Sequence, residues 1–216
     1  MFTRFTRVTA VGLTTLVASA ALGVVPTGAT AASDAPRRIG HTSLAEVLAA
    51  DGNRFDRNWQ DFDIVDRAVH TVLRAKPGSA VGVLAKGRQR VTAFVPTDRA
   101  FRRLVRSLTG NLPRTEKAAF RAVASVADVG TLEAILLYHV VPGATITSRQ
   151  AAGADGAALT TAQGGNLRVN VRKNGGIFLR DKDRNARNPQ VKVVDINKGN
   201  KQIAHGINRV LRPIDL

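Results

Sequence analysis

Hydrophobic residues recur with two different periods along this chain, and the period changes at about residue 140. In the first part, apolar residues return every three or four positions, which is typical of helices that bury one face. The spacing predicts helices over 62–75, 98–109, 115–126 and 131–137. A capping-box pattern at Ser43 and Glu46 predicts one further, short helix before them.

The second part of the chain has the alternating pattern of strands. Leu167, Val169 and Val171 alternate with polar residues, and a Gly-Gly turn then leads to 177–179, which predicts a half-exposed hairpin. Further strands are predicted at 191–196 and 203–211, and a second hairpin joins 81–85 to 91–95. Helices that gather in one half and strands in the other predict an α+β fold.

The sequence Pro96-Thr97-Asp98 predicts the start of a helix. The side chain of Thr97 or Asp98 is expected to accept hydrogen bonds from the first free amides of that helix, and Asp98 also suits the helix dipole. The apolar residues that follow at helical spacing predict its buried face, which comprises Phe101, Leu104, Val105 and Leu108.

Residues 1–31 have the composition of a secretory signal peptide. Arg4 and Arg7 precede an apolar run, and small residues lead to an Ala-x-Ala ending at Ala31. A membrane anchor is the alternative, but the small residues favour cleavage, so we expect a secreted, extracellular protein without a transmembrane anchor. Residues 32–61 are then an N-terminal extension with one short helix, and 62–216 form the domain.

Composition removes several classes of chemistry. The chain has no cysteine, so disulfides, thiol catalysis and thiolate metal sites are excluded. The formal net charge is +16, and about +14 without the leader, which favours anionic partners. The segment 181–192 resembles a calcium loop only briefly, because Ala186 and Lys192 stand where Gly and Glu are needed. No other metal-spaced or nucleophile motif occurs, so no metal or cofactor is predicted.

Three segments resemble those of the fasciclin domain: 91–101, which contains the Pro-Thr-Asp turn, 135–143, which contains Tyr138-His139, and 194–213. They occur in the family's order, and the resemblance covers roughly 62–213. It implies a wedge-shaped β-sandwich of two sheets with helices packed at one side. It also implies an extracellular module for cell adhesion or binding, and not an enzyme.

The resemblance adds two pairs of residues to a candidate binding surface. Tyr138 and His139 belong to a segment that contacts receptors in animal relatives, although a buried, hydrogen-bonded His139 is the favoured interpretation from the residues alone. Asp195 and Ile196 match a pair associated with integrin-dependent adhesion in animal fasciclin domains. The turn that follows departs from the family pattern at 201–205, so we expect a remodelled loop there.

Basic residues of the predicted hairpin and its loops complete the candidate surface: Arg168, Arg172, Arg180 and Arg184. Phe178 is the lone aromatic residue nearby, whereas nucleic-acid surfaces interleave several for base stacking. The predicted partner is therefore an extracellular protein or an anionic glycan or cell-wall polymer, and not nucleic acid. A secreted hydrolase with a site centred on His139 or His205 is the alternative.

Overall fold

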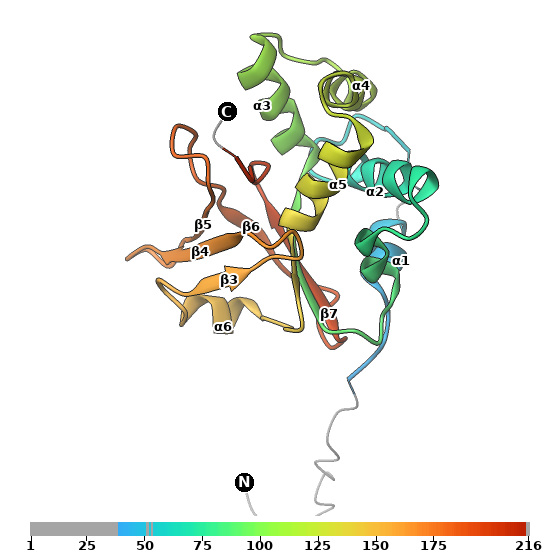
Figure 1. The fold of residues 1–216 in the computed structure, drawn as a ribbon. Helices are drawn as coiled ribbons and strands as arrows, with labels where there is room; N and C mark the ends of the chain where they lie inside the picture. Colours follow the sequence, from blue (N-terminus) through green and yellow to red (C-terminus); the bar gives the residue numbers. More distant parts are fainter. Residues whose placement is uncertain (1–38, 51, 53, 215–216) are drawn as a thin grey trace, which may run out of the picture. The chain divides into compact units, whose positions relative to one another are not determined.

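Two sheets and a layer of helices make up the part of the chain that this computed structural model describes, residues 39–50, 52 and 54–214 (Figure 1). The predicted signal peptide lies outside the described residues. The helices are α1 (Leu44–Leu48), α2 (Asp63–Ala75), the 3₁₀ helix η1 (Ala80–Ala85), α3 (Asp98–Thr109), α4 (Glu116–Val126), α5 (Val129–Tyr138) and α6 (Ser148–Ala152). The strands are β1 (Val91–Pro96), β2 (Val140–Pro142), β3 (Ala158–Thr160), β4 (Asn166–Val171), β5 (Ile177–Arg180), β6 (Val191–Ile196) and β7 (Gln202–Ile207).

The larger sheet is mixed and has the strand order β2-β1-β7-β6. Its centre is a parallel pair between β1 and β7, in register from Val91 and Gln202 to Pro96 and Ile207. The smaller sheet is antiparallel, in the order β3-β4-β5. The prediction of an α+β fold with two sheets is confirmed, and so is the hairpin between β4 and β5.

Strand β1 is buried along its whole length because both of its faces are covered. Val91, Ala93 and Val95 belong to a core cluster shared with the helices, whereas Phe94 belongs to a second cluster shared with the smaller sheet. Successive side chains of a strand point to opposite faces, so this division follows from the period of two. The larger sheet thus separates the two cores.

The segment before α2 packs onto the helical core. Leu44 and Leu48 of α1 lie in the same cluster as the helices α2 to α5. Phe55 lies 6.1 Å from the ring of Phe120, measured between centroids. The Arg102 guanidinium lies 4.6 Å from the centre of the Trp59 ring. Phe55 and Trp59 therefore help to hold this segment against the helices.

The predicted hairpin between 81–85 and 91–95 is wrong, because residues Ala80–Ala85 form the 3₁₀ helix η1. Val81 and Leu84, three positions apart, are both buried there. Side chains three apart share one face of a 3₁₀ helix, so the same apolar run buries two residues without a strand partner. Ser79 supports the turn, since its hydroxyl accepts a hydrogen bond from the amide of Val81 at 3.2 Å.

The start of α3 also differs from the prediction. Thr97 occupies the N-cap position, but no side-chain hydrogen bond caps the helix there. Asp98 instead reaches across to α2, where its Oδ1 accepts a hydrogen bond from the amide of Ile64 at 3.0 Å. Phe101 is buried as predicted, whereas Leu108 is 43% exposed and lines an apolar hollow with Val126 and Ile214.

Candidate functional surface

Tyr138 lies in the core and offers no accessible side chain. It ends α5 with none of its surface exposed, and its hydroxyl donates a hydrogen bond to the carbonyl of Asn166 at 3.1 Å. Burial raises its pKa to about 12, with a further contribution from the charge of Asp181. Because Asn166 begins β4, the ring fastens α5 to the smaller sheet.

His139 is a second buried side chain that links separate segments by hydrogen bonds. Its Nδ1 donates to the carbonyl of Ile135 at 2.8 Å, and its Nε2 accepts from the amide of Leu211 at 2.9 Å. Burial lowers its pKa to about 4, so the ring is neutral at physiological pH. The binding surface expected from the resemblance therefore receives no accessible group from Tyr138 or His139.

His205 is held in the opposite tautomer. Its Nε2 donates to the carbonyl of Ile146 at 2.8 Å, and its Nδ1 accepts from the amide of Asp195 at 3.2 Å. Burial lowers the pKa of this ring too. The hydroxyl of Ser148 donates to Asp195 and not to a histidine. Neither ring nitrogen is thus available as the general base that a hydrolase would need.

Asp195 organises the irregular strand β6. It has a positive φ of 57°, and the register of β6 against β7 shifts between Val193 and Ile196. Burial opposes ionisation, but hydrogen bonds from the amide and hydroxyl of Ser148 and from Lys198 lower the pKa of this carboxyl. Ile196 packs against the helical core. Both residues are half-buried, and their contacts stabilise the irregular part of β6.

A basic groove lies on the smaller sheet, and we define it by Arg168, Arg180 and Arg184. Arg168 of β4 and Arg180 of β5 are direct cross-strand partners, and all three side chains are exposed. They line two adjoining hollows of about 420 and 450 Å³. Like charges placed directly opposite each other destabilise a sheet, and both members of this pair line the two hollows.

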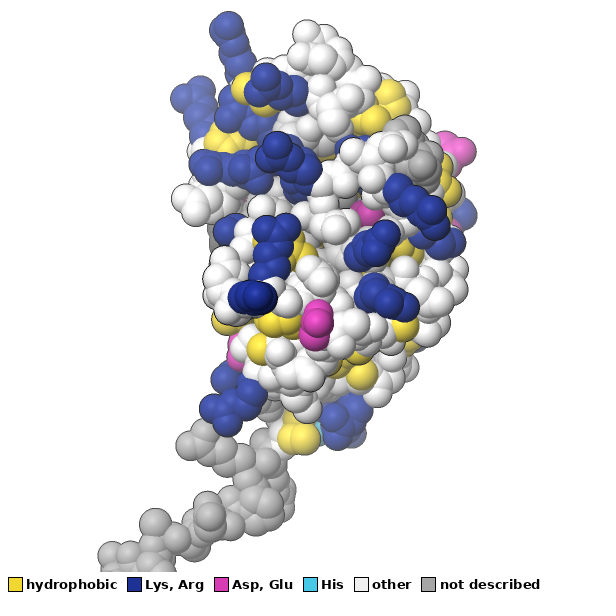
Figure 2. Space-filling model, turned by 90° about the vertical axis from the view of Figure 1, so that its left-hand side faces the viewer, with side chains coloured by type: hydrophobic (Ala, Val, Ile, Leu, Met, Phe, Trp, Pro, Cys, Tyr) yellow, Lys and Arg dark blue, Asp and Glu magenta, His cyan; other side chains and the backbone are white. Residues whose placement is uncertain are grey.

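Asp181 is a carboxyl in the wall of the basic groove. Burial raises its pKa to about 6, although its Oδ2 accepts a hydrogen bond from the amide of Arg212 at 2.9 Å. Arg172 lies outside the groove, where its guanidinium stacks 3.9 Å from the centre of the Phe178 ring. Figure 2 views the side on which the smaller sheet lies, and Lys and Arg side chains spread over it with few acids between them.

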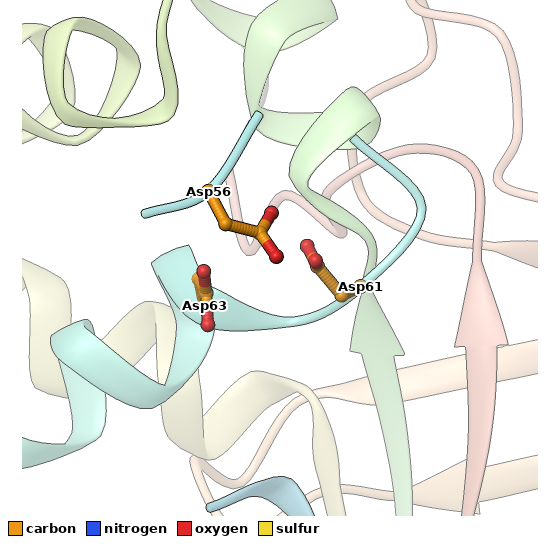
Figure 3. A group of neighbouring side chains, drawn as sticks. All are labelled: Asp56, Asp61 and Asp63. Atoms are coloured by element: carbon orange, nitrogen blue, oxygen red, sulfur yellow. The ribbon is translucent and has the colours of Figure 1, made fainter. Parts of the chain in front are cut away.

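An acidic cluster lies near the starts of three helices, and we define it as Asp56, Asp61, Asp63, Asp98 and Glu116. Figure 3 shows the side chains of Asp56, Asp61 and Asp63 pointing toward one another. Burial, together with the neighbouring carboxylates of Asp61 and Glu116, raises the pKa of Asp98 to about 9. Of these five residues, the sequence pointed only to Asp98, and in the role of a helix cap.

The fasciclin domain model of protein families matches residues 70–213, which is more than half of the chain. The chain belongs to the fasciclin family. A solved structure described as a FAS1 domain pair from the insect cell adhesion molecule Fasciclin I has the same fold, with a TM-score of 0.52 and 18% sequence identity. That match covers 80% of this chain and 51% of the insect chain, so the present chain spans about half of its length. A comparison with curated proteins found no match.

Family membership carries a general statement about function. Fasciclin domains are adhesion-type modules of extracellular and cell-surface proteins, and they are generally non-enzymatic. Among the described residues of this fasciclin protein, no helix combines the length and the apolar character needed to cross a membrane. The hydrogen bonds of His139 and His205 to backbone groups inside the domain are consistent with this general function.

Proposed function

We propose that this fasciclin protein is a secreted, non-enzymatic adhesion module that attaches to an anionic extracellular polymer through its basic groove. The polymer would be a glycan or cell-wall chain that carries carboxylate or phosphate groups. The observation that carries the proposal is the cross-strand pair of Arg168 and Arg180, with Arg184 beside it, at two adjoining hollows.

The chemistry of the groove suits a repeating anion. Guanidinium groups bind carboxylate and phosphate in a bidentate manner, and exposed arginines keep their charge at any physiological pH. Two hollows on the shared arginine wall offer neighbouring positions for successive charges of one chain. The net charge of about +14 without the leader attracts such a chain over a distance but does not decide where it binds.

The test compares two triple variants with the same loss of charge. Arg168, Arg180 and Arg184 are changed to Gln in the first. In the second, the exposed residues Arg74, Arg88 and Arg121, which do not line the two hollows, are changed to Gln. Binding to immobilised alginate, a polymer of carboxylated sugars, is measured for both, with neutral dextran as the blank.

We expect the groove variant to bind at least about tenfold more weakly than wild type, because three charge-assisted contacts are lost. The control variant should lose no more than about threefold, the effect of a screened, distant charge. Equal losses in the two variants would contradict the proposal, since attraction would then depend on net charge alone. Thermal melts of both variants check that the fold is unchanged.

A further inference from the structure

Five carboxylates converge where the loop before α2 meets the first residues of α2, α3 and α4. Asp56 and Asp61 lie in the loop, while Asp63, Asp98 and Glu116 are the first residues of the three helices. They form two overlapping groups that share Asp61, and within each group one oxygen per residue lies within 4.8 Å of the others. The chain has only 16 acidic residues, so five in one place is a strong concentration of negative charge.

Backbone amides hold one oxygen of several of these carboxylates. The amide of Ile64 donates to Asp98 Oδ1 at 3.0 Å, and the amide of Arg57 donates to Glu116 Oε2 at 3.1 Å. Asp56 Oδ1 likewise accepts from the amide of Asn58 at 2.7 Å. Hydrogen bonds of this kind orient the ligands of a metal site from behind. They leave the second oxygen of each carboxylate for another partner.

The second oxygens of Asp98 and Glu116 are the observation that points to a ligand. Asp98 is 0% exposed and Glu116 is 1% exposed, so neither carboxylate reaches water. Within the described part of the chain, no donor group bonds to Asp98 Oδ2 or Glu116 Oε1, and the side chain of Asp98 faces that of Asp61 within hydrogen-bond range. Burying a carboxylate is costly unless a positive group compensates it, and here two buried carboxylates share Asp61 as a neighbour.

We propose that the acidic cluster binds one Ca²⁺ ion, with Asp61, Asp98 and Glu116 as inner ligands and Asp56 and Asp63 completing the oxygen shell. Oxygen-only ligands suit a hard cation, and no histidine belongs to either group. Calcium–oxygen distances of about 2.3–2.6 Å allow ligand oxygens to lie about 5 Å apart across the ion. That range accommodates the oxygens of each group, which lie within 4.8 Å of one another.

The site also has an entrance on the solvent side. Asp56 is exposed and Asp61 is half-buried, whereas Asp63, Asp98 and Glu116 are buried behind them. An ion can therefore exchange its water for carboxylate oxygens from Asp56 inward. Calcium sites of extracellular modules bind with dissociation constants of about 10⁻⁴–10⁻³ M, which is the range we expect here. The inference does not depend on the function proposed for the basic groove.

The rival explanation is that the buried acids share a proton and bind no metal. Terbium distinguishes the two, because Tb³⁺ occupies calcium sites and emits when a nearby tryptophan is excited. Trp59, the sole tryptophan, lies between Asp56 and Asp61, and its carbonyl accepts a hydrogen bond from the amide of Arg99 at 2.8 Å. Bound Tb³⁺ should thus show sensitised emission that millimolar Ca²⁺ reverses and equal NaCl does not.

Three single variants assign the signal to the cluster. Asp61→Asn and Glu116→Gln should each weaken Tb³⁺ binding at least about tenfold, because a charged ligand is lost. Asp56→Asn, at an exposed position, should weaken it less and protects the test should a buried variant fail to fold. Asp155→Asn is the matched control outside the cluster, since an amide oxygen can still accept the hydrogen bond from Val171. That control should bind as wild type does.

Thermal melts supply the second readout. With 10 mM CaCl₂ in place of a chelator, the wild-type melting temperature should rise by about 3–6 °C, and that of Asp61→Asn should not change. Emission that Ca²⁺ fails to displace, or that the Asp61, Glu116 and Asp56 variants all retain at wild-type strength, would overturn the calcium site. A wild-type melt indifferent to Ca²⁺ would overturn it as well.

Discussion

The basic groove and the acidic cluster concentrate charges of opposite sign, and they also differ in exposure: the arginines of the groove are exposed, whereas three carboxylates of the cluster are buried. Arg168, Arg180 and Arg184 stand on the exposed side of the smaller sheet, where solvent screens their repulsion. Asp98 and Glu116 are buried, and amides from other segments hold one oxygen of each. Exposed charges cost the folded state little when no partner is bound. Buried charges must be compensated by a proton or an ion when the chain folds.

His139 and His205 also differ from the exposed arginines in burial. His139 and His205 were candidates for a catalytic centre, but each uses both ring nitrogens on backbone groups. In this fasciclin domain the two buried histidines therefore hold separate backbone segments together.

The largest effect should come from the apolar core beneath the helices whose first residues belong to the acidic cluster. Phe101 is 4% exposed on the inner face of α3. Phe101→Ala should lower the free energy of unfolding by about 3–5 kcal/mol, because it removes a large buried ring and leaves a cavity. Denaturant unfolding measures this cost. An unchanged unfolding midpoint would mean that the helical core does not support the domain as described.

A smaller effect should come from the buried end of the acidic cluster. Asp98→Ala leaves the amide of Ile64 without its acceptor and should cost about 1–3 kcal/mol in calcium-free solution. Asp98→Asn should stay within about 0.5 kcal/mol of wild type. The reason is that a carboxyl whose pKa is about 9 is already neutral at pH 7, and the amide can keep the same acceptor. Chemical unfolding of both variants in chelator checks the pair, and equal costs would contradict this account.

The smallest effect concerns Asp181, a carboxyl that lines both hollows of the basic groove. Asp181 has a pKa raised to about 6, so it loses its negative charge as pH falls through that value. Binding to alginate should therefore be about two- to fivefold tighter at pH 5 than at pH 7.5, the usual worth of one partly screened charge. Asp181→Asn should bind at pH 7.5 as wild type does at pH 5. Affinity that weakens on acidification would contradict the sign of this effect.

The sequence predicted those elements whose residues carry their own pattern. The alternation of Leu167, Val169 and Val171 was enough for the β4–β5 hairpin, and helical spacing placed Phe101 in the core. The run Val81–Ala85 was misjudged because five residues fit a strand and a 3₁₀ helix equally well, and packing decides between them.

The acidic cluster could not be predicted because its members are far apart in sequence. Asp61 and Glu116 are separated by 55 positions, and only the packing of loop and helices brings them together. The one available signal was the close spacing of Asp56, Asp61 and Asp63, where the loop leads into α2. Likewise, Asp98 looked like a local cap, but its partner is Ile64, 34 residues away.

The salt dependence of polymer binding tests the central claim most directly. Wild type, the groove variant of Arg168, Arg180 and Arg184, and the control variant of Arg74, Arg88 and Arg121 are titrated with alginate between about 50 and 500 mM NaCl, over which the screening length falls from above 10 Å to below 5 Å. We predict a steep loss of affinity with salt for wild type and control, and a much shallower one for the groove variant. Three parallel salt dependences would contradict a binding site at the basic groove.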